Sequence, residues 1–194
     1  MKELFRKIFN KIGDEFFTIP NMLSIVRILL IPVIVYLYCF RHDNISTFAV
    51  VAFSTLTDIV DGYIARRFDM ITDFGKFLDP VADKATQLTV LVCLITRFKY
   101  MVIPFVVLAI KEIFSLVLRF IAYRETEMVE GAKWHGKAAT GIIVAAIGIH
   151  LLWDGITVPV SIGFVAFATV FMVFSGVLYT VDVVRMMKSY EKQD

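Results

Sequence analysis

The sequence has few residues that bind soft metals or cross-link a chain, and it has little polar sequence. Only two of its 194 residues are cysteines and only three are histidines. Cys39 and Cys93 lie in apolar runs, so we expect buried small hydrophobic residues rather than a disulfide or a metal-binding pair. The sequence also has no internal repeat, and its longest polar connection, residues 124–135, leaves no room for a separate soluble domain.

Apolar residues are abundant instead. They make up 58% of the chain, and the mean hydropathy of +0.75 is well above that of an ordinary soluble domain. Hydrophobic stretches of about 20 residues recur, each long enough to cross a bilayer core. Because lipid cannot satisfy open backbone groups, we expect an all-α integral membrane protein. The six predicted transmembrane helices are Asn21–Phe40, Ser46–Ala65, Pro80–Thr96, Met101–Tyr123, Gly136–Trp153 and Val158–Arg185.

Residues 3–17 differ from these six stretches. Their bulky apolar side chains fall on one helical face, and charged side chains occupy the rest. This pattern predicts an amphipathic helix in the membrane interface, with a loosely ordered basic tail as the alternative. We therefore expect an amphipathic segment at residues 1–19 and one six-helix membrane domain at residues 20–194. A cleaved signal peptide is not expected, because the first apolar run is too long and lacks an Ala-x-Ala-like exit.

Basic residues are distributed unevenly among the connections. The segment before the first span, the connection after the second, the region around the end of the fourth and the C-terminal tail each carry several lysines and arginines. The opposite connections carry only Arg41, Arg97 and Lys99. By the positive-inside rule, this asymmetry predicts a multi-pass protein of the plasma membrane with both termini in the cytoplasm.

Four aspartates lie near the ends of predicted spans, where charge is costly. They belong to a motif with the spacing D-x2-D-G-x2-A-R-x8-G-x3-D-x3-D, made up of Asp58, Asp61, Gly62, Ala65, Arg66, Gly75, Asp79 and Asp83. An ionisable group at membrane depth costs roughly 2.5 kcal/mol or more and therefore indicates a functional site. Four adjacent carboxylates would also repel one another, and bound divalent cations are the simplest remedy.

The spacing of the motif predicts how its members meet. Asp58, Asp61 and Ala65 share one face of a helix, and Asp79 and Asp83 share a face of the next. Because the link between the two helices is short, we expect antiparallel neighbours with an oxygen-ligand cage between them, on the cytoplasmic side. Oxygen ligands favour Mg²⁺, Mn²⁺ or Ca²⁺, and the lack of cysteine and histidine in the motif argues against structural zinc.

The remaining motif residues fit phosphoryl transfer. Gly62 and Ala65 remove bulk from the carboxylate face, and Arg66 supplies a positive charge suited to a phosphate. Carboxylates, metal ions and an arginine suit displacement at phosphorus, with one carboxylate accepting the proton of the attacking hydroxyl. Structural alternatives exist, because Asp79 could cap a helix, an aspartate could pair with Arg66 or Lys84, and the small residues could serve helix packing.

The motif resembles the signature of the CDP-alcohol phosphatidyltransferase family at every defining position. The segments IPNMLSIVRILLIP and LTDIVDGYIARRFDMITDFGKFLDPVADK are similar to bacterial phosphatidylglycerophosphate synthases of that family. The resemblance implies a six-helix membrane enzyme, commonly a homodimer. Such an enzyme transfers a phosphatidyl group from CDP-diacylglycerol to an alcohol and releases CMP, with no covalent enzyme intermediate.

The resemblance also implies roles for the motif residues. Two Mg²⁺ or Mn²⁺ ions would be held by Asp58, Asp61, Asp79 and Asp83. Asp83 would also be the general base. The cytidine diphosphate would be bordered by Asp61, Gly62, Ala65, Arg66 and Gly75.

The acceptor alcohol depends on cations outside the motif. Glycerol 3-phosphate needs positive groups, and the candidates are Lys111, Arg119 and Lys137, which could also be ordinary positive-inside anchors. The segment KEIFSLVLR is similar to a synthase segment, but Lys111 replaces an arginine and loses its planar fork. In GKAAT, Ala139 stands where those synthases usually have a second lysine.

These features predict an enzyme that makes phosphatidylglycerophosphate and CMP from CDP-diacylglycerol and glycerol 3-phosphate. Its other partners would be the bilayer and a second copy of the chain, and no nucleic acid is expected. One alternative is a cardiolipin synthase that uses phosphatidylglycerol, and others use a different acceptor within the same family. Outside the class, an ion-pathway protein would also contain intramembrane carboxylates, but the acidic residues here are confined to one membrane edge.

Two histidines outside the motif have no predicted catalytic role. His135 lies between Trp134 and Gly136, so we interpret it as an interfacial residue rather than an acid or base. His150 lies deep in the fifth predicted span, with no partner that the sequence identifies.

Overall fold

The computed structural model describes residues 18–68, 72–126 and 134–191, in which the regular secondary structure is helical. The elements are α2 (Ile19–Val35), the π-helical turn η1 (Tyr36–Phe40), α3 (Asn44–Arg67), α4 (Asp73–Arg97), the 3₁₀ turn η2 (Lys99–Met101), α5 (Val102–Thr126), α6 (Trp134–Leu152) and α7 (Val158–Glu191). The prediction of an all-α protein is confirmed. The predicted amphipathic helix at residues 3–17 lies outside the described residues.

Five helical segments in the described part of the chain are long and apolar enough to cross a membrane. They are Ile19–Phe40, Asn44–Ala65, Lys99–Ala122, Trp134–Leu152 and Val158–Ser189. The chain is therefore an all-α membrane protein. The predicted span Pro80–Thr96 lies within α4, which is not among the five, so the count of six spans is not confirmed.

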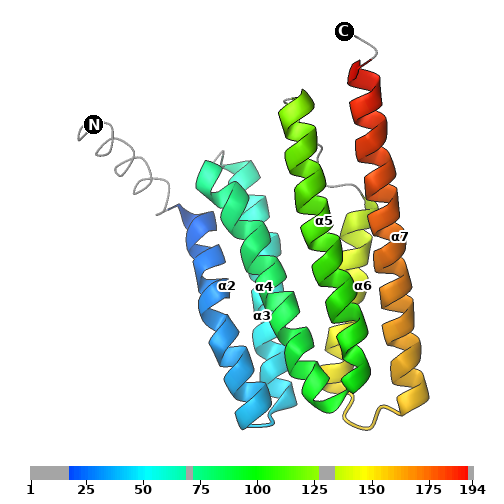
Figure 1. Cartoon of the computed structure of the whole chain (residues 1–194). Helices are drawn as coiled ribbons and strands as arrows, with labels where there is room; N and C mark the ends of the chain where they lie inside the picture. The colour runs from blue at the N-terminus through cyan, green and yellow to red at the C-terminus, as the bar shows by residue number, and fades with distance from the viewer. Residues whose placement is uncertain (1–17, 69–71, 127–133, 192–194) are drawn as a thin grey trace, which may run out of the picture. The chain divides into compact units, whose positions relative to one another are not determined.

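The helices form two compact units, Met1–Cys93 and Leu94–Asp194. In the first unit α2 packs against α3, and in the second unit α7 packs against both α5 and α6 (Figure 1). Both units bury apolar side chains completely, among them Ile34 and Leu91 in the first and Leu108 and Met172 in the second. Hydrophobic helix faces thus hold each unit together.

The start of α4 differs from the prediction. This helix begins at Asp73 rather than at Pro80, so Asp79 and Pro80 lie inside it. Thr72 Oγ1 accepts a hydrogen bond from the Gly75 amide at 3.0 Å, which satisfies one of the open donors of the first turn. The alternative that Asp79 caps this helix is therefore wrong.

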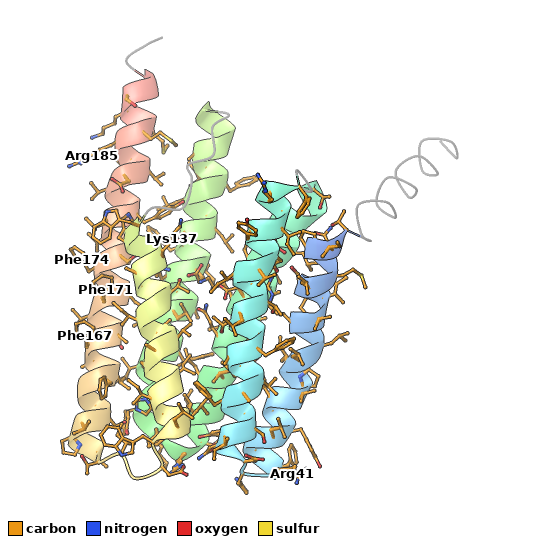
Figure 2. The ribbon with its side chains drawn as sticks, turned by 180° about the vertical axis from the view of Figure 1, so that it is seen from behind. Arg41, Lys137, Phe167, Phe171, Phe174 and Arg185 are labelled. Carbon is orange, nitrogen blue, oxygen red and sulfur yellow. The ribbon has the colours of Figure 1, made fainter. Side chains whose placement is uncertain are left out.

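The surface of α7 carries a row of aromatic side chains. The ring centroids of Phe167 and Phe171 are 6.4 Å apart, and those of Phe171 and Phe174 are 5.9 Å apart (Figure 2). Phe167 and Phe174 are exposed. An exposed apolar face of this kind suits contact with lipid or with another membrane helix.

Candidate active site

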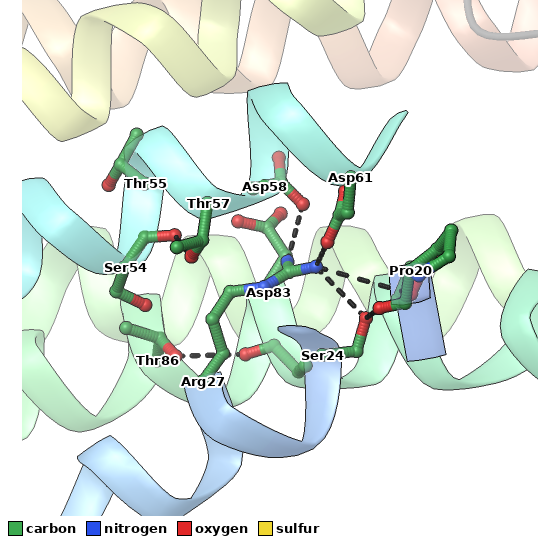
Figure 3. A network of polar contacts seen from close by, with 12 residues as sticks. Pro20, Ser24, Arg27, Ser54, Thr55, Thr57, Asp58, Asp61, Asp83 and Thr86 are labelled. Carbon is green, nitrogen blue, oxygen red and sulfur yellow. Dashed lines mark hydrogen bonds and ion pairs between the residues drawn. The ribbon is translucent and has the colours of Figure 1, made fainter. Parts of the chain in front are cut away.

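The carboxylates of the acidic motif meet within the first unit (Figure 3). Asp58 and Asp61 come from α3, three residues apart, and Asp79 and Asp83 come from α4, four residues apart. Each pair occupies one helical face, as the spacing predicts. The helices α3 and α4 therefore contribute two acidic residues each.

A guanidinium from a third helix lies at the centre of this cluster. Arg27 on α2 pairs through Nη1 with Asp58 Oδ1 and through Nη2 with Asp61 Oδ2 (Figure 3). Nη2 also lies 4.0 Å from Asp79 Oδ1. The Arg27 side chain is 1% exposed, so its charge depends on these carboxylates for compensation. Its Nε is buried without a hydrogen-bond partner in the described part of the chain.

Two more polar residues of α2 extend the contact towards α4. The Ser24 hydroxyl accepts a hydrogen bond from Arg27 Nη2 at 3.1 Å and donates one to Asp79 Oδ1. One turn earlier, Asn21 Nδ2 donates to Thr72 Oγ1 at 3.0 Å. Asn21, Ser24 and Arg27 are all buried and follow one another at three-residue intervals. They form a polar stripe on an otherwise apolar helix.

Asp83 makes different contacts from the other three aspartates. Its Oδ1 accepts a hydrogen bond from Gln87 Nε2 at 2.8 Å, and its Oδ2 lies 3.3 Å from Lys84 Nζ. The side chain is 29% exposed. A carboxylate held in this way stays within reach of a substrate hydroxyl.

The donor set suits a hard divalent cation. Arg27 and Lys84 contact four carboxylates, so two negative charges are left when all four are ionised. Asp58 and Asp79 are 40% and 35% exposed, and their oxygens are the ligands that Mg²⁺ and Mn²⁺ prefer. As the side chains stand, no three acidic, histidine or cysteine residues in the described ranges are arranged around one ion. Instead, the carboxylates of Asp58, Asp61 and Asp79 each lie within 4.0 Å of the Arg27 guanidinium.

The small residues of the motif have distinct surroundings. Gly62 and Ala65 are half-buried on α3. Gly75 is buried, and a Cβ atom there would clash with Asn21 Oδ1 and lie 3.0 Å from Thr72 Oγ1. The structure thus gives Gly75 a packing role, because α4 approaches α2 too closely for any side chain. Arg66 is part of α3, but its side chain lies outside the described structure.

The predicted acceptor-site cations belong to the second unit. Lys111 on α5 is half-buried, and its Nζ lies 2.7 Å from Glu112 Oε1. Its Cγ would lie 3.6 Å from a Cβ atom added at Gly176 of α7. Lys137 on α6 is exposed (Figure 2), and Arg119 is on α5 with a side chain that is not described.

His135 and His150 are both buried within the second unit. His135 is 3% exposed, with Nδ1 3.3 Å from Ser175 Oγ and Nε2 3.3 Å from Asp182 Oδ2. It therefore links the first turn of α6 to α7, and its position at the membrane interface stays a prediction. His150 lies with Nε2 2.6 Å from Ser161 Oγ, a partner that its own helix does not contain.

The two cysteines are free thiols, as expected, but they face each other. Cys39 Sγ and Cys93 Sγ are 3.8 Å apart, and Cys93 is buried. This contact joins η1 to α4 within the first unit. Nothing in the local sequence around either residue predicts it.

The fold and the site define a class: an all-helical membrane protein in which two helices of one unit supply a cluster of carboxylates. Residues 17–181 match the family model for CDP-alcohol phosphatidyltransferase. The chain belongs to this family, and it is an enzyme of the phosphatidyltransferase class.

Several curated proteins are similar in sequence. The CDP-diacylglycerol–glycerol-3-phosphate 3-phosphatidyltransferase of Pseudomonas fluorescens is 38% identical over 52% of this chain and 54% of that protein. The Haemophilus influenzae protein of the same name is 34% identical over 71% of this chain and 76% of its own length. The cardiolipin synthase (CMP-forming) of Streptomyces coelicolor is 32% identical over 91% of this chain and 87% of its own length. The alignment thus spans about half of the Pseudomonas protein but most of the other two.

Sequence reasoning gave no role to Arg27, although it is the residue that most of the cluster contacts. A signal was present, because Arg27 is the only charged residue between positions 21 and 40. A lone charge in a membrane-spanning stretch marks a functional or compensating contact. The partners of that charge, however, lie on other helices.

Proposed function

We propose that the chain transfers a phosphatidyl group from CDP-diacylglycerol to glycerol 3-phosphate, giving phosphatidylglycerophosphate and CMP. The observation that carries this proposal is the cluster of four aspartates from α3 and α4, with three of them more than a quarter exposed. Relatives named for this reaction align with the chain, and the one from Haemophilus influenzae covers 71% of it. The reaction would take place at the cytoplasmic face of the plasma membrane, in a homodimer.

We infer that two Mg²⁺ or Mn²⁺ ions take part, held by the carboxylates of Asp58, Asp61, Asp79 and Asp83. The charge balance supports two ions, because the cluster keeps two negative charges and the diphosphate of CDP-diacylglycerol adds two more. When bound, such ions would neutralise the diphosphate and stabilise the charge that develops during displacement at phosphorus.

Asp83 is the proposed general base. Its carboxylate takes the proton of the acceptor hydroxyl while the hydroxyl oxygen attacks the lipid-bearing phosphorus. The bond from that phosphorus to the oxygen of CMP breaks, and CMP leaves with the electron pair. The contacts with Gln87 and Lys84 orient Asp83 without covering it, which supports this role.

The other motif residues would bind the nucleotide. The lack of bulk at two half-buried positions of α3 leaves room for a ligand beside the helix backbone. An arginine at the end of the same face supplies a charge for the diphosphate. The proposed set is Asp61, Gly62, Ala65, Arg66 and Gly75.

Lys111, Arg119 and Lys137 are the proposed ligands of the acceptor phosphate. Lys111 is half-buried in a membrane-spanning helix, where a charge is costly unless it has a function or a partner. The Glu112 carboxylate beside it compensates that charge. A phosphate of the acceptor would then compete with Glu112 for the ammonium group.

A cardiolipin synthase is the second candidate, with phosphatidylglycerol as acceptor. The Streptomyces coelicolor protein of that name aligns with 91% of this chain. Ala139, where the glycerophosphate enzymes usually have a lysine, is 2% exposed on α6. Membership of an enzyme family leaves the ion-pathway alternative without support.

An activity assay with purified protein in lipid nanodiscs and radiolabelled CDP-diacylglycerol distinguishes the two candidate reactions. CMP release and the lipid product would be followed with Mn²⁺ and either glycerol 3-phosphate or phosphatidylglycerol, with EDTA samples as the metal-free control. Product with glycerol 3-phosphate alone supports the first candidate, and product with phosphatidylglycerol alone supports the second. Turnover that persists in EDTA would refute the metal dependence.

A further inference from the structure

We propose that Arg27 is a positioning residue that fixes the carboxylate cluster for its divalent ions. In this arrangement the guanidinium holds the aspartates from the buried side, and the ions bind from the exposed side. The inference rests on the proposed metal-dependent function and adds to it a residue outside the acidic motif.

The contacts of Arg27 need the fork of a guanidinium. Nη1 holds Asp58 and Nη2 holds Asp61, so the two nitrogens fix two carboxylates at once. Nη2 also donates to Ser24, which in turn donates to Asp79. One side chain thus sets the positions of three aspartates on two helices. A lysine ammonium at this position would keep the charge but not the planar pair of donors.

The burial of Arg27 indicates that it stays in place when ions bind. Its side chain is 1% exposed, and the side chain of its partner Asp61 is 3% exposed. If an ion displaced the guanidinium from both carboxylates, a buried positive charge would be left without a partner, which is strongly unfavourable. Competition between Arg27 and an ion for the same oxygens is therefore the less favourable arrangement.

The exposed side of the cluster presents carboxylate oxygens that Arg27 does not contact. Arg27 contacts one oxygen each of Asp58 and Asp61, so each keeps a second oxygen. Asp58, Asp79 and Asp83 are 40%, 35% and 29% exposed. Arg27 therefore lies where it can orient the metal-binding carboxylates through hydrogen bonds from their buried side. The loss of such contacts typically weakens metal binding 10–100-fold.

The test measures Mn²⁺ binding to protein in nanodiscs by electron paramagnetic resonance titration. The double variant Asp58→Asn/Asp79→Asn serves as the blank that lacks the metal-binding carboxylates. We expect Arg27→Lys to bind Mn²⁺ about 10–100-fold more weakly than the wild type. The half-saturating Mn²⁺ concentration for CMP release should rise by the same factor, with turnover at saturating Mn²⁺ largely retained. Arg97→Lys is the matched control, because Arg97 also makes two hydrogen bonds, to Asp154, but is 41% exposed.

The outcomes separate this inference from the proposed function. Mn²⁺ binding in Arg27→Lys that equals the wild type, or exceeds it, overturns the positioning role. Wild-type protein that binds no more Mn²⁺ than the blank refutes the metal dependence itself, and the inference with it. If Arg27→Lys does not fold, Ser24→Ala removes the link to Asp79 without changing any charge. Mn²⁺ binding should then weaken several-fold, and unchanged binding overturns the inference.

Discussion

Replacing Gly75 with alanine tests whether α4 begins directly against α2. A Cβ atom at this position would lie closer than 3.0 Å to Asn21 Oδ1 and 3.0 Å from Thr72 Oγ1. Real Cβ atoms essentially never come within 3.0 Å of another heavy atom, so Asn21 would have to move. Asn21 is 1% exposed and donates a hydrogen bond to Thr72, so it cannot move without losing packing and that bond.

The expected cost follows from these two losses. Overpacking a buried site costs about 1–3 kcal/mol, and a net hydrogen bond is worth about 0.5–1.5 kcal/mol. We therefore expect Gly75→Ala to lower the free energy of unfolding by about 2 kcal/mol, which lowers Tm by about 4–8 °C for a chain of this size. The assay heats purified protein in detergent and measures the monodisperse fraction by size-exclusion chromatography.

Two further variants make the test specific. Gly163→Ala makes the same change on α7, where a Cβ atom would meet nothing within 4 Å, so stability should be unchanged or slightly higher. In an Asn21→Ala background the closest contact of the new methyl group is gone. The additional effect of Gly75→Ala should therefore shrink, as a double-mutant cycle would measure.

Two results would refute the packing argument for Gly75. One is a Gly75→Ala protein that melts at the same temperature as Gly163→Ala. The other is an effect of Gly75→Ala that is equal with and without the Asn21 side chain. Lost CDP-diacylglycerol binding at unchanged Tm would instead indicate that Gly75 borders the nucleotide, as the family resemblance implies.

Three other predictions concern single contacts. Asp83→Asn should slow CMP release about 10²–10⁴-fold while Mn²⁺-dependent CDP-diacylglycerol binding persists, and wild-type turnover would rule out Asp83 as the base. Copper phenanthroline added to membranes should oxidise Cys39 and Cys93 to a disulfide, seen as the loss of both titratable thiols; two thiols that survive would contradict their 3.8 Å separation. The hydroxyl and the backbone amide of Ser46 donate hydrogen bonds to the Asp43 carboxylate, which caps α3, and they lower its pKa. This cap should therefore stabilise the folded protein at pH values above about 3.9, the pKa of an aspartate in the unfolded chain. The difference in Tm between wild type and Asp43→Ala should then shrink as the pH falls below the unfolded pKa and through the lowered one, and a difference that does not change with pH would contradict the cap.

The four aspartates of the candidate site could be predicted because the geometry of each pair depends only on residue spacing along one helix. Asp58 and Asp61 share a helical face whatever the rest of the fold does, and so do Asp79 and Asp83. Only residues 68–72 separate α3 from α4 along the chain. Residue spacing was therefore sufficient to predict each pair, and the short connection indicated that the two pairs meet.

The contacts that α2 makes with these aspartates could not be predicted in the same way. Arg27 contacts partners 31 and 34 residues further along the chain, and Ser24 contacts one 55 residues away. Spacing within α2 shows that Ser24 and Arg27 share a face, but it does not show which helix that face meets. The same reason explains why the sequence did not identify Asp182 as a partner of His135, since the two are 47 residues apart.

The start of α4 was misplaced because the prediction followed the hydrophobic stretch, which begins at Pro80. The alternative of a cap at Asp79 pointed to the same place, since a proline after an aspartate is typical of the first turn of a helix. The structure instead begins the helix at Asp73 with Thr72 as the hydrogen-bonding residue, and it accommodates Pro80 inside. As a result Asp79 lies in the second turn, where Ser24 of α2 reaches it.

Charge explains why, among the side chains that the structure describes, the cluster contains one arginine rather than none or several. Without Arg27, the carboxylates of Asp58, Asp61 and Asp79 would lose the cation that they contact, and folding before ion binding would be opposed by their repulsion and desolvation. With several arginines the cluster would be neutral, and it would have no electrostatic reason to bind divalent ions. A single buried guanidinium stabilises the ion-free fold and still leaves the negative charge on which the proposed metal dependence relies. The stability of the ion-free protein and its affinity for Mn²⁺ should therefore both depend on Arg27.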